Sequence, residues 1–141
     1  MVRTIKSPIL GIPIVVIHQT PKQFMQYYKK NIDIKAEIQI DDTVAGYNGM
    51  VTLRQTRNGQ FKLFLWLCDE GEGIVADYGT VFHESFHIVC RIRECMYGMS
   101  DELAINPSNE EDWAYLISEV SKLLFDCVDS MQKELDKRVN K

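Results

Sequence analysis

The chain has 141 residues, of which 45% are hydrophobic and 26% are charged, and its formal net charge is −4. This composition is typical of a globular protein, and we expect one domain spanning residues 1–141 around a single hydrophobic core. The negative charge argues against a nucleic-acid partner, because binding to phosphate normally relies on a basic patch.

No apolar segment of the sequence is long enough to predict a membrane span. The run at residues 9–17 follows two basic residues, as in a short signal peptide, but prolines and a glycine interrupt it. The four cysteines show no Cys-x-x-Cys spacing; they are Cys68, Cys90, Cys95 and Cys127. We therefore expect reduced thiols, a cytoplasmic protein and no membrane partner.

The first third of the chain predicts a strand followed by a helix. Residues 9–18 are rich in Ile and Val and predict a buried strand, which Pro13 would place at an edge or a bulge. Thr20 followed by Pro21 predicts the N-cap and the first residue of a helix, which should end near Asn31.

Three further segments have the patterns of strands. Residues 32–40 alternate apolar and polar side chains, which predicts a half-buried strand. Residues 50–57 and 60–67 flank Asn58 and Gly59, the strongest short signal for a β-hairpin. We expect a small sheet to be complete before the next helix begins.

Two histidines, His83 and His87, lie either side of Glu84 in the pattern His-Glu-x-x-His. Residues four apart share one face of a helix, so both imidazoles can bind a single ion beside the glutamate. Residues 81–96 are largely apolar and predict a helix buried over most of its circumference. A polar stripe runs through it at spacings of three and four, formed by Thr80, His83, Glu84, His87, Arg91 and Glu94.

This stripe has two interpretations. Polar groups on a buried helix need partners, since burying them unpaired costs several kcal/mol each. A zinc site with its own general base would supply those partners; in the alternative, the stripe simply faces water.

A long helix is predicted from Ser108 to Val139 by a continuous apolar stripe, and Gly98 should end the helix before it. A catalytic zinc site takes three protein ligands and leaves one position for water, so two histidines are not enough. Glu110 and Glu111, which open the long helix, are the candidates for the third ligand.

The two motifs together resemble the gluzincin metallopeptidases. In that superfamily the third zinc ligand is a glutamate on the next helix, often in a Glu-x-x-Ala pattern like that of Glu111 and Ala114. The order of elements is similar to a minimal zincin domain and to small zincin-type proteins of phages and prophages. The resemblance covers about residues 60–120.

The resemblance implies an α+β, zincin-like fold. A small mixed or antiparallel N-terminal sheet with a helix would precede the His-Glu-x-x-His helix, and a long C-terminal helix would carry the third ligand. It also implies Zn²⁺ as cofactor, His83, His87 and Glu111 as its ligands, and Glu84 as the catalytic general base. The substrate would be a peptide or protein, and an extended peptide could add along the strand at residues 60–67.

Glu111 also has a competing structural role. The run from Ser108 to Glu111 reads as a capping box, in which the glutamate only returns a hydrogen bond to the backbone of Ser108. Helical phase favours Glu110, because Glu111 lies about a third of a turn off the apolar stripe. We favour Glu111 as ligand because the Glu-x-x-Ala pattern fits it alone.

The leading functional hypothesis is a zinc-dependent metallopeptidase. The alternative from another class is a zincin-fold binding or structural protein that holds a metal without proteolytic turnover, and the short chain supports it because little is left for a deep cleft. A third hypothesis is a zinc hydrolase that acts on a non-peptide substrate.

Overall fold

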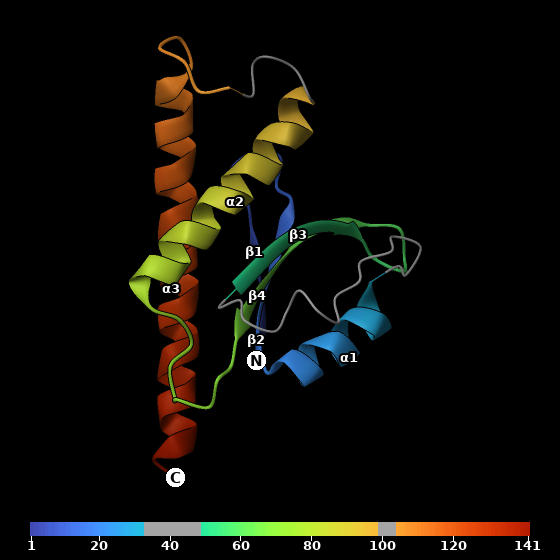
Figure 1. Ribbon diagram of the computed structural model, residues 1–141, viewed down its shortest axis with the longest axis vertical. Coiled ribbons are helices and arrows are strands. Elements are labelled where there is room, and N and C mark those ends of the chain that lie inside the picture. The colour runs from blue at the N-terminus through green and yellow to red at the C-terminus, as the bar shows by residue number, and fades with distance from the viewer. Residues whose placement is uncertain (33–48, 99–103) are drawn as a thin grey trace.

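The computed structural model describes residues 1–32, 49–98 and 104–141, which form a four-stranded mixed sheet and three helices (Figure 1). In chain order the elements are β1 (Val2–Lys6), β2 (Pro13–Gln19), α1 (Pro21–Asn31), β3 (Gly49–Gln55), β4 (Phe61–Cys68), α2 (Tyr78–Tyr97) and α3 (Glu110–Val139). The strand order is β1-β2-β4-β3, with β2 and β4 parallel and both outer pairs antiparallel. The α+β class predicted from the sequence is confirmed.

The two central strands form the most buried layer of the molecule. Ile14 to Ile17 in β2 and Leu63 to Leu67 in β4 are at most 3% exposed, as expected for parallel strands covered on both faces. The prediction that Pro13 marks an edge or a bulge is wrong. Pro13 is the first residue of the interior strand β2, opposite Lys6, and a proline is tolerated at that position.

The first edge strand, β1, has no counterpart in the sequence prediction. Residues 9–12, which were expected to be strand, form the tight connection from β1 to β2 instead. Leu10 and Gly11 have positive φ angles of 63° and 59° there, and the N–H of Ser7 donates to the carbonyl of Ile12 at 3.0 Å. The turn carries the signals of Pro8 and Gly11, but the Ile and Val content of residues 9–18 predicts one continuous strand across it.

Both faces of the sheet are covered by helices (Figure 1). On one face, Phe24 of α1 stacks on Trp66 of β4 with ring centroids 5.0 Å apart. On the other face, α2 and α3 pack over the apolar side chains of β2 and β4. The larger of the two cores therefore lies beneath α2, the helix that carries the two predicted zinc ligands.

The local predictions for α1 and the hairpin are confirmed. The hydroxyl oxygen of Thr20 accepts a hydrogen bond from the backbone N–H of Gln23 at 3.3 Å. In turn, the side-chain oxygen of Gln23 accepts one from the backbone N–H of Thr20 at 3.1 Å, which completes a capping box. β3 and β4 pair antiparallel through the turn at Gly59. The strand predicted at residues 32–40 lies outside the described residues except for Ile32, which forms an isolated bridge with Thr56.

The long helix α3 packs antiparallel to α2. Tyr78 at the start of α2 contacts Phe125 at 5.5 Å between ring centroids, and Phe86, two turns further on, contacts Trp113 at 6.2 Å. The ranges of α2 and α3 agree with the predicted helices, including the end of α2 at Gly98, which has a positive φ of 64°.

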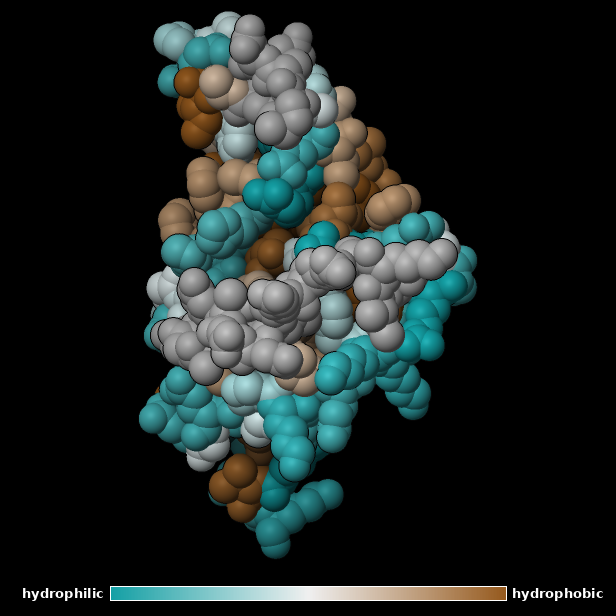
Figure 2. Space-filling model, turned by 45° about the vertical axis from the view of Figure 1, so that its right-hand side comes forward, coloured by the Kyte–Doolittle hydropathy of each residue, from teal (hydrophilic) through white to brown (hydrophobic). Residues whose placement is uncertain are grey.

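The face of the molecule drawn in Figure 2 is largely hydrophilic, and apolar side chains gather mainly in its upper part. Within the described residues, no helix combines the length and the apolar character that crossing a membrane requires.

The burial of α2 predicts which of its faces stabilises the fold. Ile88 is fully buried against the sheet, whereas Phe82 is 58% exposed. Replacing Ile88 by alanine should lower the free energy of unfolding by about 2–5 kcal/mol, because it leaves a cavity in the core. Phe82→Ala should lower it by about 0.5 kcal/mol or less. Urea unfolding of both variants tests this, and a larger loss for Phe82→Ala would mean that α2 is rotated from the position described.

Candidate metal centre

Helix α2 brings the two predicted zinc ligands together. The Nε2 atoms of His83 and His87 are 3.1 Å apart and the ring centroids 4.8 Å apart, and both side chains are exposed. Two nitrogens bound to one tetrahedral zinc at 2.0–2.1 Å would lie roughly 3.3 Å apart. The separation of the two nitrogens therefore matches that of two ligands of one ion, although in this structure the two rings are also within hydrogen-bond distance of each other.

The N-terminal turn of α2 and its core contacts fix the position of this pair. Asp77 is the N-cap, and its carboxylate accepts from the N–H of Thr80 at 2.7 Å. Three buried residues of α2 face the core and fix the rotation of the helix about its axis: Val81, Ser85 and Ile88. The opposite side of the same turns is thereby left to the two histidines.

Glu84 lies between these two sides of α2. Its side chain is only 5% exposed, and Oε2 has no hydrogen-bond partner among the described residues. Burial raises the pKa of its carboxyl group, and the neighbouring His83 opposes that shift. A buried acceptor without a partner is costly, and it marks a place where a water molecule or ligand is expected.

Gly49 at the start of β3 lies directly against this carboxylate. A Cβ at position 49 would lie 2.9 Å from Glu84 Oε1 and 3.1 Å from its Cδ. A side chain at residue 49 would therefore require the Glu84 carboxylate to shift from this position. Sequence reasoning missed this role, since nothing local links a glycine to a glutamate 35 positions later.

Burial lowers the pKa of His87, and the charges of His83 and Arg91 lower it further. A lowered pKa favours the neutral imidazole, which is the form that binds metal ions.

A groove lies beside the histidine pair, between α2 and the strand β3. It has a volume of about 500 Å³ and is lined by residues 51–54 of β3 and by His87, Arg91 and Glu94 of α2. The expectation that a peptide adds along residues 60–67 is wrong, because that strand, β4, is hydrogen-bonded on both sides. The strand at the edge is β3, which among the described residues pairs with β4 alone.

The described residues do not bring a third ligand to the pair. They contain no group of three or more His, Cys, Asp or Glu side chains arranged to hold a metal ion. Glu110 and Glu111 are both exposed. Trp113 faces α2, and successive residues of a helix are rotated by about 100° around its axis. Glu111 therefore lies on nearly the opposite side of α3 from Trp113, whereas Glu110 lies only about 60° around the axis from it.

The competing structural role of Glu111 is not found. The N-cap of α3 is Asn109, without a side-chain capping bond, and the hydroxyl of Ser108 donates to Asn106 Oδ1 instead. The assignment of Glu111 as the third ligand stays a prediction.

Burial raises the pKa of all four cysteine thiols, which favours their protonated form. A protonated thiol is a weak ligand and a weak nucleophile. All four are free thiols, in agreement with their spacing in the sequence.

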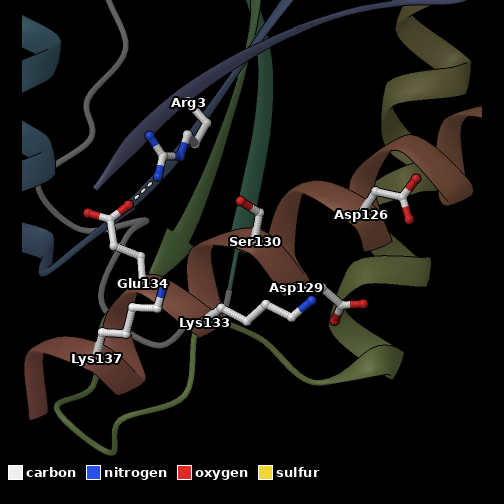
Figure 3. A pocket seen from close by; sticks show the side chains of 7 residues that line it. All are labelled: Arg3, Asp126, Asp129, Ser130, Lys133, Glu134 and Lys137. Atoms are coloured by element: carbon white, nitrogen blue, oxygen red, sulfur yellow. Dashed lines mark hydrogen bonds and ion pairs between the residues drawn. The ribbon is translucent and has the colours of Figure 1, made fainter. Parts of the chain in front are cut away.

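A second hollow lies where α3 passes β1 (Figure 3). Its side chains carry mixed charges, and Arg3 of β1 forms an ion pair with Glu134 of α3 across it. Among the described residues that line it, Ser130 alone carries a hydroxyl and none is a histidine that could activate it. We therefore assign the hollow no catalytic role.

Comparison of the chain with protein-family models, with curated proteins and with solved structures finds no match in any of the three.

The buried Glu84 carboxylate predicts a pH-dependent gain of stability on its removal. Because its pKa is raised in the folded protein, the wild type loses stability as the pH rises through that pKa. Glu84→Gln should therefore unfold at a higher temperature than the wild type at about pH 8, and the difference should shrink towards about pH 4. Thermal scans of both proteins with a chelator present measure it. A constant difference across this range would mean that the carboxyl group is not destabilised by burial.

Proposed function

We propose that this protein is a zinc-dependent metallopeptidase with a gluzincin-type, zincin-like fold. The observation that carries the proposal is the unpartnered, buried carboxylate of Glu84 beside two convergent imidazoles. A solvated polar stripe would not bury one of its carboxylates without a partner.

Zinc would be held by His83 and His87, whose Nε2 separation already suits one ion. Glu111 is the proposed third ligand on its Glu-x-x-Ala pattern, and Glu110 is the alternative that helical phase favours. When bound, zinc would lower the pKa of water and polarise the carbonyl of the scissile bond.

Glu84 would act as the general base. Its free oxygen accepts the proton of the attacking water, and the same carboxyl group then delivers a proton to the leaving amine. A base works best when its pKa lies near the working pH, and burial shifts the pKa of Glu84 in that direction. Gly49 would fix the carboxylate by packing against it.

The substrate would be a peptide or protein in extended conformation. Within the part of the chain that the structure describes, β3 is an edge strand, and its residues 51–54 form one wall of the groove that His87 also lines. A peptide added to β3 would gain main-chain hydrogen bonds and pass along the histidine pair. The free thiols of the chain are consistent with the cytoplasmic location that we also propose.

Zinc binding is the first expected outcome. The protein purified with zinc should hold about one equivalent per chain, and His83→Ala or His87→Ala should lose it, because each removes one nitrogen of the pair. Elemental analysis measures the content. Full zinc content in both variants would show that the ion binds elsewhere.

The third ligand is tested by two neighbouring variants. Glu111→Gln should weaken zinc binding by roughly ten- to a hundredfold or more, while Glu110→Gln should change it little. The reverse order would assign Glu110. If neither variant affects zinc content, neither glutamate is the third ligand.

Activity should depend on the carboxylate of Glu84 and on the space that Gly49 leaves for it. Glu84→Gln should retain zinc and lose at least about a hundredfold in cleavage rate, the usual contribution of a positioned acid-base group. Gly49→Ala should retain zinc and lose about ten- to a hundredfold, because its Cβ displaces the carboxylate. Mass spectrometry of a digested peptide library measures the rates.

Lys22→Ala is the control, since Lys22 is exposed on α1, which packs on the face of the sheet opposite to α2. Unchanged cleavage in both Glu84→Gln and Gly49→Ala would contradict the proposed base. The binding or structural function is the second candidate, because the described residues provide only two ligands. Failure of the wild type to cleave any peptide in the library would favour that function.

A further inference from the structure

The connection from β4 to α2, residues 69–77, passes along the C-terminal part of α3, and we call it the strap (Figure 1). Its second half is held by Gln132 of α3. The side-chain oxygen of Gln132 accepts from the N–H of Val75, and its amide nitrogen donates to the carbonyl of Gly73, both at 2.8 Å. Residues 70–72, in the first half, are exposed to solvent.

His18, near the end of β2, faces the strap with an unpaired nitrogen. The residue is 3% exposed, and its Nε2 has no hydrogen-bond partner among the described residues. The nearest charged acceptor is Oδ1 of Asp69 at 3.9 Å, which is too far for a hydrogen bond. A buried polar nitrogen without a partner opposes folding, and it marks a place where the structure holds a potential interaction in reserve.

The surroundings of His18 favour the neutral imidazole. Burial lowers the pKa of His18 and the nearby ammonium of Met1 lowers it further, while the Asp69 carboxylate and a backbone hydrogen bond with Ile74 oppose the shift. The Met1 ammonium donates to the carbonyl of His18 at 2.8 Å. Three further charged side chains, from α3 and β1, act on that ammonium in turn: Arg138, Glu134 and Arg3.

Asp69 is already engaged in the turn that opens the strap. Its Oδ1, the oxygen closest to His18, accepts from the N–H of Gly71 at 2.9 Å, and its side chain is 34% exposed. A protonated imidazole donates from both nitrogens, so Nε2 would then need an acceptor. A charge-assisted bond of 2.7–2.9 Å requires Nε2 and Oδ1 to approach each other by about 1 Å.

We propose that protonation of His18 draws the Asp69 carboxylate into an ion pair and rearranges the turn at residues 69–72, which makes the strap a pH-sensitive element of the fold. The same oxygen serves Gly71 now and His18 after protonation, so the turn cannot stay unchanged. The movement is confined to this turn, because the N–H of Asp69 is bonded to the carbonyl of Gln19 at 3.0 Å and Gln132 holds the strap beyond it. The proposal does not depend on the proposed metal centre.

The test is an NMR titration of the full-length, ¹⁵N-labelled protein from about pH 8 to about pH 5. Because burial lowers the pKa of His18, its ring should take up a proton below about pH 6.5, the ordinary value for histidine. The amide resonance of Gly71 should shift with the same midpoint as the ring. The amide of Val75, which Gln132 holds, should shift less and serves as the internal reference.

Three variants assign the response to this pair. Asp69→Asn should lower the midpoint of His18 by about 0.5–1 pH unit, because it removes the opposite charge. His18→Gln should keep the Gly71 resonance constant over the same range, since glutamine takes up no proton. Glu72→Gln is the matched control, because Glu72 is an exposed carboxylate of the same turn, and it should leave both responses as in the wild type.

A Gly71 shift that follows His18, disappears in His18→Gln and survives in Glu72→Gln would support the proposal. A ring that stays neutral until the protein unfolds, a midpoint that Asp69→Asn leaves unchanged, or a Gly71 amide that does not respond would overturn it. If His18→Gln does not fold, the wild type and Asp69→Asn decide the matter, because the side chain of Asp69 is partly exposed and its replacement removes no core contact.

Discussion

The burial of one carboxylate, that of Glu84, is the constraint on which the proposed site depends. Helical spacing alone is enough to converge His83 and His87, and it would do so on any exposed helix. The burial of Glu84 needs more, because its carboxylate packs into the space that the glycine at the start of β3 leaves. Keeping a carboxylate buried with one oxygen unpartnered opposes folding. Such a local cost is common where a group is held ready for a ligand or a reaction.

The sheet supplies the rest of the arrangement. β2 and β4 pair in parallel and are buried on both faces, so they form a rigid layer against which the core side of α2 packs. With those two strands inside, β3 is the edge strand of the sheet as far as the described residues go, and it lies beside α2. In the proposed function, the helix would contribute the metal ligands and the strand would contribute backbone groups for an extended peptide. The groove follows directly from this strand order.

The features that the sequence predicts correctly are local ones. The N-cap at Thr20, the hairpin turn at Gly59 and the convergence of the two histidines on one face of α2 are each set within a few residues. The features it predicts wrongly or misses are long-range. The parallel pairing of β2 with β4 moved the edge from β4 to β3, and Gly49 gains its role from a residue far along the chain. The polar stripe of α2 already contained Arg91, but only the position of β3 makes it part of a groove. The third ligand depends on how α3 packs on α2, which helical periodicity alone does not determine.

The most direct test of the central claim is a crystal structure of the zinc-loaded protein with anomalous scattering data collected at the zinc edge. The account predicts one strong peak about 2.0–2.1 Å from the Nε2 atoms of both His83 and His87, with a carboxylate as third ligand and Glu84 close to the ion but not bound to it. A peak away from the two histidines, or a zinc ion bound directly by Glu84, would contradict it.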